Sequence, residues 1–238
     1  MNTPCLLAFD AATQRLCVAA SHAGRVALRE LEPARDHTPL VYRLAVEVLT
    51  EVGTNIAGLD AVAFGCGPGS FTGVRVAAAA AQSIAYARRI PVCRVSSLRL
   101  LAASAGPAAG DEPVAVCMDA RMGRVYAALF ENGATGAASE TWSDPATLAW
   151  PGESRFRAVG DGWTAWPDLL QRYANRMSGH DAALLPSAQV LLDLAIAEYR
   201  AGRHVTAAEA LPEYLGQMPA RPAGVAASIA MPQGSLPQ

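Results

Sequence analysis

The chain has 238 residues, of which 52 % are apolar and 17 % are charged, a balance typical of a well-packed globular protein and unlike that of a disordered chain. The formal net charge is −2, so no overall positive field points to nucleic acid. Neither a signal peptide nor an apolar run of membrane-spanning length is recognisable, so we expect a cytoplasmic protein that has no membrane as a partner.

The first third of the chain predicts strands followed by a long helix. Residues 5–10, 16–21 and 26–31 are expected to form strands of two successive hairpins, the first strand ending in a carboxylate. A helix is expected from Thr38, which can cap it, to about residue 52. Apolar residues cover more of this helix than one buried face requires.

A glycine-rich segment, residues 65–75, joins the next strand to a second helix. The strand is expected at residues 59–65 and the helix at 71–88, followed by a strand at 90–95 and a short helix at 96–105. This order of elements resembles one half of the duplicated ribonuclease-H-like fold of actin, the heat-shock ATPases and the sugar kinases.

The second half begins with a partial repeat of the first. After a linker that contains proline and glycine, a strand at residues 114–119 again ends in Asp119, and a hairpin partner follows at 124–130. Beyond it the pattern predicts only a short strand at 157–160 and an amphipathic helix at 187–201. We therefore expect an α/β protein of actin/sugar-kinase type that has two mixed-sheet domains.

The predicted domains are residues 1–106, which carry the two long helices, and residues 107–238. The second domain is expected to be degenerate, with a mobile tail after about residue 220, because proline, glycine, alanine and serine dominate there.

The glycine-rich segment has two interpretations. Its backbone N–H groups could bind an anion at the start of the helix, or its glycines could simply allow a tight turn and close packing. It is not a Walker A loop, because the chain contains no lysine, and its glycine spacing does not match a dinucleotide-binding loop.

The string Gly67-Pro-Gly-Ser-Phe-Thr-Gly-Val-Arg75 closely resembles the signature of the TsaB (YeaZ) family, bacterial proteins of the threonylcarbamoyladenosine tRNA-modification system. The resemblance is strong over residues 5–130 and thin afterwards. Departures are Thr38 where the family usually has serine, Ala11 after the strand-end aspartate, and Gly216 where the C-terminal Pro-x-Tyr-Leu motif usually continues with arginine.

The resemblance implies a non-catalytic paralogue of TsaD. Such a subunit would hold TsaD in an active form within the complex that makes N6-threonylcarbamoyladenosine at position 37 of tRNAs reading ANN codons. It implies a heterodimer with TsaD, TsaE in a larger complex, a homodimer when TsaD is absent, and only indirect contact with tRNA. ATP and Mg²⁺ would act only within the complex, so no cofactor is expected for this chain alone.

The two apolar helices are where the resemblance places the partner interface. The alternative is that both helices are buried within their own domain. The candidate contact residues are Leu40, Leu44 and Val48 on the first helix, and Val74, Arg75, Ala78, Gln82 and Tyr86 on the second.

A second function, an actin-fold small-molecule kinase or ATPase, stays open because strand-end carboxylates in this superfamily can hold Mg²⁺ through water. The residues of such a vestigial nucleotide site would be Asp10, Thr13, Gly67, Gly69, Ser70 and Asp119. No metal site is expected, since no two of the four histidines are spaced i, i+4 and the five cysteines form no C-x-x-C pair. No catalytic residue set has supporting spacing, which disfavours a peptidase.

Overall fold

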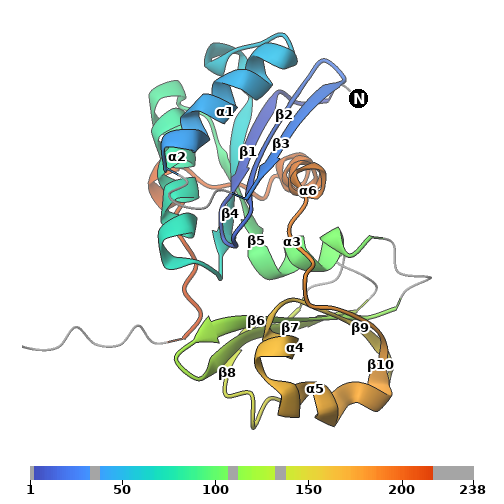
Figure 1. The fold of residues 1–238 in the computed structure, drawn as a ribbon. Coiled ribbons are helices and arrows are strands. Elements are labelled where there is room, and N and C mark those ends of the chain that lie inside the picture. Colours follow the sequence, from blue (N-terminus) through green and yellow to red (C-terminus); the bar gives the residue numbers. More distant parts are fainter. Residues whose placement is uncertain (1–2, 33–37, 107–111, 132–137, 217–238) are drawn as a thin grey trace, which may run out of the picture.

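The computed structural model describes residues 3–32, 38–106, 112–131 and 138–216. These form two five-stranded mixed sheets, each covered by helices. Figure 1 shows the first sheet and its helices in the upper half of the view, and the second sheet with α4 and α5 in the lower half. The fold is therefore α/β with two mixed sheets, as the sequence predicts.

The first sheet has the strand order β3-β2-β1-β4-β5. Strand β1 pairs antiparallel with β2 and parallel with β4, and β4 continues parallel to β5. The strand predicted at 59–65 begins two residues later than expected, because residues 56–58 form a 3₁₀ turn capped by the Asn55 side chain. The strands are β1 Leu6–Asp10, β2 Leu16–His22, β3 Arg25–Leu31, β4 Ala61–Gly67 and β5 Val92–Ser96.

Helices cover both faces of this sheet (Figure 1). Because side chains alternate along a strand, Leu7 and Phe9 of β1 pack with helices α1 and α2, whereas Leu6 and Ala8 pack with α6. The helices are α1 Thr38–Glu51, α2 Phe71–Arg88, α3 Ser97–Ser104 and α6 Ala188–Arg200. The bounds of α2 are those predicted.

The second sheet has the order β10-β9-β6-β7-β8. Its β6–β7 hairpin is antiparallel, and β9 and β10 add in parallel. Four packed rings, Trp150, Phe156, Trp163 and Tyr173, form much of its core. The elements are β6 Val114–Arg121, β7 Arg124–Phe130, β8 Thr141–Ser143, β9 Phe156–Val159, α4 Gly162–Ala165, α5 Pro167–Tyr173 and β10 Met177–Asp181, with 3₁₀ turns at Ala174–Arg176 and Ala207–Glu209.

The two sheets correspond strand for strand. Reading each from the antiparallel edge, β3-β2-β1-β4-β5 has the same directions and connectivity as β8-β7-β6-β9-β10. The partial repeat seen in the sequence, a strand ending in Asp10 and another reaching Asp119, is therefore the visible part of a duplicated sheet.

The chain returns to the first sheet after it has built the second. Helix α6 packs on β1, β2 and β5, far from it in sequence, as Figure 1 shows. The division of the chain at residue 106 stays a prediction, and the tail predicted to be mobile lies outside the described residues. Among the residues described here, no helix is both long and apolar enough to cross a membrane.

Candidate functional site

Asp10 lies at the carboxyl end of β1 and is completely buried. Its Oδ2 accepts a hydrogen bond from the Ala12 backbone N–H at 3.4 Å, whereas its Oδ1 has no hydrogen-bond partner among the described residues. The carboxyl group fills the space beside Gly65, where an added Cβ would lie 1.8 Å from Oδ1. Burial raises the pKa of Asp10 to about 7, because desolvation penalises the charged form more than the single backbone hydrogen bond stabilises it.

The glycine-rich segment packs directly against the turn that follows Asp10. The Ser70 backbone N–H donates to the Ala12 carbonyl at 2.7 Å, and a Cβ on Gly69 would lie 2.4 Å from that same oxygen. At Gly73 an added Cβ would lie 1.8 Å from the Ala11 carbonyl oxygen. The Ser70 and Gly73 N–H groups thus have partners within the protein, and these glycines allow close packing on residues 11 and 12, which favours the interpretation as a tight turn.

The remaining nucleotide-site candidates serve local structure. The Thr13 hydroxyl accepts from the Arg15 backbone N–H at 3.2 Å. Asp119 accepts from the Arg121 backbone N–H and pairs with the Arg121 side chain, both at 3.0 Å. The structure therefore brings Asp10, Gly69 and Ser70 to one turn, whereas Thr13 and Asp119 make separate contacts.

Gly67, the last candidate, lies beside the C-terminal segment. Its φ is +102°, and a Cβ there would lie 2.9 Å from the Glu213 carbonyl oxygen. The C-terminal segment, not a ligand, therefore sets the need for glycine at this position. Within the described part of the chain, no three His, Cys, Asp or Glu side chains are grouped to hold a metal ion.

The candidate interface residues divide into two groups. Leu44, Val48, Val74 and Ala78 are buried. Leu44, Val48 and Ala78 belong to the cluster with which α1 and α2 cover the first sheet, whereas Val74 lies beside Gly67. These side chains have no surface to offer a partner, which corrects their assignment as contact residues. Leu40, Arg75 and Gln82 are partly exposed, and 81 % of Tyr86 is exposed.

The exposed apolar side chains of the two helices lie on the opposite side from this core. Tyr42 and Val46 on α1 are 48 % and 58 % exposed, and Phe71 on α2 is 58 % exposed. None of these three was singled out from the sequence, although their helical spacing places them off the buried stripe. The Tyr42 hydroxyl hydrogen-bonds the Ser83 hydroxyl at 3.3 Å, which holds α1 and α2 side by side.

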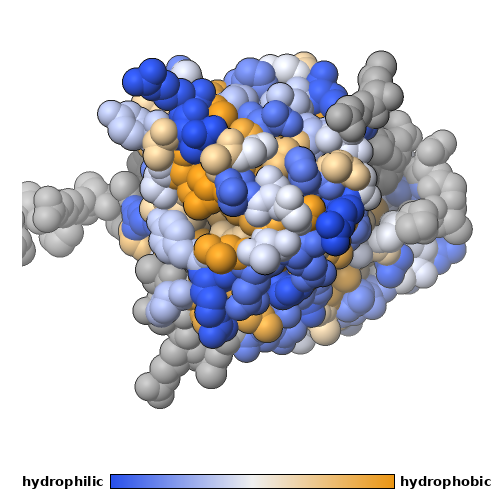
Figure 2. All heavy atoms as spheres, turned by 90° about the horizontal axis from the view of Figure 1, so that it is seen from above, coloured by the Kyte–Doolittle hydropathy of each residue, from blue (hydrophilic) through white to orange (hydrophobic). Residues whose placement is uncertain are grey.

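A hollow of about 260 Å³ lies on this face. We refer to it as the α1/α2 hollow. Figure 2, which views the end of the molecule at the top of Figure 1, shows hydrophobic patches among strongly hydrophilic residues. The hollow is lined by Tyr42, Phe71, Thr72, Arg75, Val76 and Ala79.

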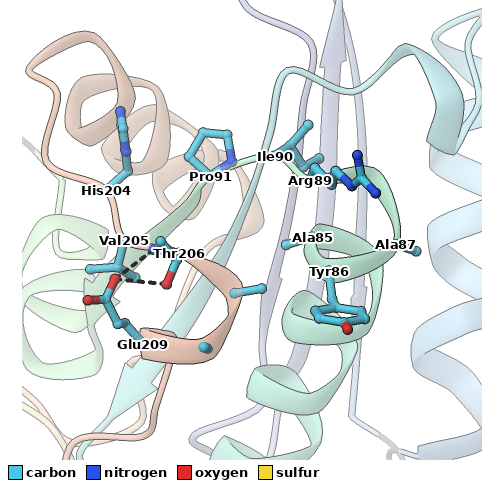
Figure 3. Close-up of a pocket in the computed structure, with 12 residues that line it drawn as sticks. Ala85, Tyr86, Ala87, Arg89, Ile90, Pro91, His204, Val205, Thr206 and Glu209 are labelled. Atoms are coloured by element: carbon cyan, nitrogen blue, oxygen red, sulfur yellow. Dashed lines mark hydrogen bonds between the residues drawn. The ribbon is translucent and has the colours of Figure 1, made fainter.

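A larger pocket, of about 860 Å³, lies between the C-terminal end of α2 and residues 204–209. Figure 3 shows Tyr86 and Arg89 on one side and His204 and Glu209 on the other. The Glu209 carboxylate accepts from the Thr206 backbone N–H and hydroxyl at 3.0 and 2.8 Å, so it serves as a cap (Figure 3). Alanine, isoleucine, proline and valine form most of the remaining lining.

Comparison with known proteins places the chain in a family. A family model described as "TsaD: tRNA N6-adenosine threonylcarbamoyltransferase" matches residues 31–228. The tRNA threonylcarbamoyladenosine biosynthesis protein TsaB of Escherichia coli is 36 % identical over 88 % of this chain and 94 % of its own length. The protein of the same name from Haemophilus influenzae is 34 % identical over 90 % and 94 %. The chain belongs to the TsaB (YeaZ) family.

Solved structures of the family agree with this assignment. A structure described as YeaZ from Pseudomonas aeruginosa superposes with a TM-score of 0.76 at 35 % identity, and covers 89 % of this chain and all of its own. A second Pseudomonas aeruginosa structure, described as similar to peptidase YeaZ, reaches 0.78 at 35 % identity, over 90 % of this chain and all of its own.

The departure from the family motif at Gly216 has a structural account. Its φ is +92°, and a Cβ there would lie 2.7 Å from the Trp142 ring. An arginine at this position would have to adopt a strained backbone and displace that ring.

Proposed function

We propose that this chain is a non-catalytic subunit of the complex that forms N6-threonylcarbamoyladenosine at position 37 of tRNAs reading ANN codons. In this proposal it binds and stabilises a TsaD-type transferase in the cytoplasm, with a TsaE-type ATPase in the larger complex. It pairs with a second copy of itself when the transferase is absent, and meets tRNA only through the complex. ATP and Mg²⁺ act only within the complex, and the chain alone needs no cofactor.

The observation that carries the proposal is the exposed apolar face of α1 and α2. The exposed fractions of Tyr42, Val46, Phe71 and Tyr86 are 48 %, 58 %, 58 % and 81 %. Exposed clusters of aromatic and apolar side chains around a hollow are typical of protein interfaces. Two helices from each partner can bury about 1,200–2,000 Å², the ordinary size of a stable interface.

The closed turn around Asp10 supports the non-catalytic part of the proposal. The space between β1 and the start of α2 is filled by backbone contacts at Ala11 and Ala12. The names of the Escherichia coli and Haemophilus influenzae relatives support a role in the biosynthesis of threonylcarbamoyladenosine in tRNA.

Size-exclusion chromatography with the TsaD-type subunit of the same organism tests the proposal. Ala79→Arg introduces a long charged side chain at an exposed position in the α1/α2 hollow, so we expect loss of the shared peak. Ala197→Arg is the matched control, because Ala197 is an exposed helical alanine on α6, across the sheet. Two unshifted peaks for the unmodified pair would contradict the proposal.

A second candidate function, a small-molecule kinase or ATPase, rests on the unpartnered Oδ1 of Asp10. Titration calorimetry with Mg-ATP separates the two candidates. Absence of heat at millimolar nucleotide eliminates the kinase, and saturable heat that Asp10→Asn removes would favour it.

A further inference from the structure

Arg75 is held against an aromatic ring on the exposed side of α2. Its guanidinium carbon lies 3.2 Å from the centroid of the Phe71 ring, one helical turn earlier. A guanidinium stacked in this way uses its flat face and leaves its N–H donors free along its edge. No carboxylate pairs with Arg75 among the residues that the structure describes, whereas Arg43 on α1 pairs with Glu47 at 3.6 Å.

A second ring reaches Arg75 from the C-terminal segment. The centroid of the Tyr214 ring lies 5.5 Å from the Arg75 guanidinium carbon and 6.4 Å from the centroid of the Phe71 ring. The neighbouring Glu213 fixes this segment, because its backbone N–H donates to the Cys66 carbonyl at 2.7 Å and its carboxylate pairs with Arg94 at 3.0 Å. The C-terminal Pro-x-Tyr-Leu motif and the glycine-rich signature thus meet at one arginine.

The α1/α2 hollow lies beside this arginine, and Arg75 carries the positive charge of its described lining. We propose that Arg75, positioned by Phe71 and Tyr214, binds a carboxylate from a helix of the partner protein, while apolar neighbours of that carboxylate fill the hollow. This inference rests on the proposed function, since it specifies the chemistry that the partner must present to the same face.

The surroundings favour a protein carboxylate over a nucleic-acid phosphate. Beside Arg75 the lining of the hollow is mainly apolar and includes Tyr42, Phe71, Val76 and Ala79, so a group that binds there meets few other polar partners. In such a setting an arginine fork that meets a carboxylate bidentately is a strong and selective contact. Binding to a phosphate backbone relies on several cations in a row, and the described lining supplies one.

Calorimetric titration of the full chain with its TsaD-type subunit tests the inference. We expect Arg75→Met, which keeps the packing of the side-chain stem, to raise the Kd by about 10- to 100-fold. Arg75→Lys should recover little of this loss, because an ammonium lacks the planar fork. We also expect Tyr214→Ala to weaken binding by about 3- to 10-fold and Tyr214→Phe to leave it unchanged, because the phenyl ring alone supports the guanidinium.

The control is Arg200→Met, which removes the charge of an exposed arginine on α6 and should leave Kd within about twofold. Thermal unfolding of each variant establishes that it is folded. Equal Kd for the unmodified chain and Arg75→Met overturns the inference and leaves the proposed function standing. No binding by the unmodified chain overturns both. If Arg75→Met leaves the affinity for the subunit unchanged but weakens the binding of tRNA to the assembled complex, the inference of a carboxylate partner is wrong and Arg75 contacts nucleic acid instead.

Discussion

The carboxyl group of Asp10 shows how a residue typical of an active site can serve the fold. The sequence alone makes this strand-end aspartate a candidate magnesium ligand. Here the side chain is fully buried against Gly65 and accepts one backbone hydrogen bond. Because little compensates its desolvation, the pKa of Asp10 is raised to about 7, and below that pH the folded state holds mainly the neutral acid, which is a poor ligand for a cation.

This burial predicts an unusual pH dependence of stability. The pKa of Asp10 is about 7 in the folded state and about 3.9 in an unfolded chain, so between these values the folded state holds a proton that the unfolded state has released. The contribution of Asp10 to the free energy of unfolding is therefore greatest below about pH 4, falls as the pH rises to 7, and is constant above. Asp10→Asn should remove this fall, which is on the order of a few kcal/mol.

Urea unfolding at pH 5, 6, 7 and 8 measures the effect. The difference between the two profiles isolates Asp10 from other groups, including Glu140, whose pKa is also raised by burial. Asp168→Asn, on the exposed first turn of α5, is the control and should leave the profile unchanged. Parallel profiles for Asp10→Asn and the unmodified chain would contradict the account.

At the scale of the element, helix α2 depends on how closely its first turn approaches the turn after β1. The Ser70 hydroxyl accepts from the Gly73 backbone N–H at 3.3 Å and caps the helix. Gly73 then lies against the Ala11 carbonyl, which no side chain there could clear. The signature glycines are thus explained by packing between two backbones.

Gly73→Ala is therefore expected to destabilise the protein although alanine favours a helix. The gain in helix propensity is about 1 kcal/mol, but a Cβ 1.8 Å from a backbone oxygen forces the start of α2 away from β1. We expect a net loss of about 1–3 kcal/mol in the free energy of unfolding, measured with urea. Gly179→Ala, where an added Cβ meets nothing within 4 Å, should be neutral. Equal stability of the two variants would contradict this explanation.

The elements that could be predicted are those with long, regular patterns. The bounds of α2 and of the 124–130 strand follow directly from the sequence. The strands β8 and β10 and the helices α4 and α5 could not be predicted, because each is too short to show a period. The exposed residues Tyr42 and Phe71 were missed for a different reason: a helix with apolar side chains all round does not reveal which stripe its own sheet covers.

At the scale of the whole molecule, the first sheet is completed by residues far along the chain. Helix α6 supplies Leu191, Leu192 and Ala195 to the cluster that covers Leu6 and Ala8 of β1. The sequence predicts this helix but not the sheet on which it packs, because its apolar stripe fits either. An ion pair also joins α6 to α3: the largely buried Glu198 carboxylate of α6 accepts a hydrogen bond from the Arg99 side chain of α3 at 2.7 Å.

This arrangement predicts that residues 1–106 do not form a stable domain alone. Without α6, one apolar face of the sheet is open to water, and each large side chain left uncovered forfeits about 1.5–3 kcal/mol. We expect the fragment to bind a hydrophobic dye and to unfold without a cooperative transition. Joining residues 183–216 to it through a flexible linker should restore cooperative unfolding in urea.

The point variant Leu191→Ala in the full chain checks the same argument without truncation. Leu191 is fully buried, so its truncation should cost about 2–5 kcal/mol, whereas Asp193→Ala on the exposed side of α6 should cost little.

If residues 1–106 instead unfold cooperatively alone, the predicted division at residue 106 is a physical domain boundary and α6 is not needed for the first domain to fold. If only the joined fragment does so, the folding unit that presents α1 and α2 to a partner includes the C-terminal segment. Tyr214 and the α2 signature then lie in one unit, and support of Arg75 by the Tyr214 ring is a property of the domain itself.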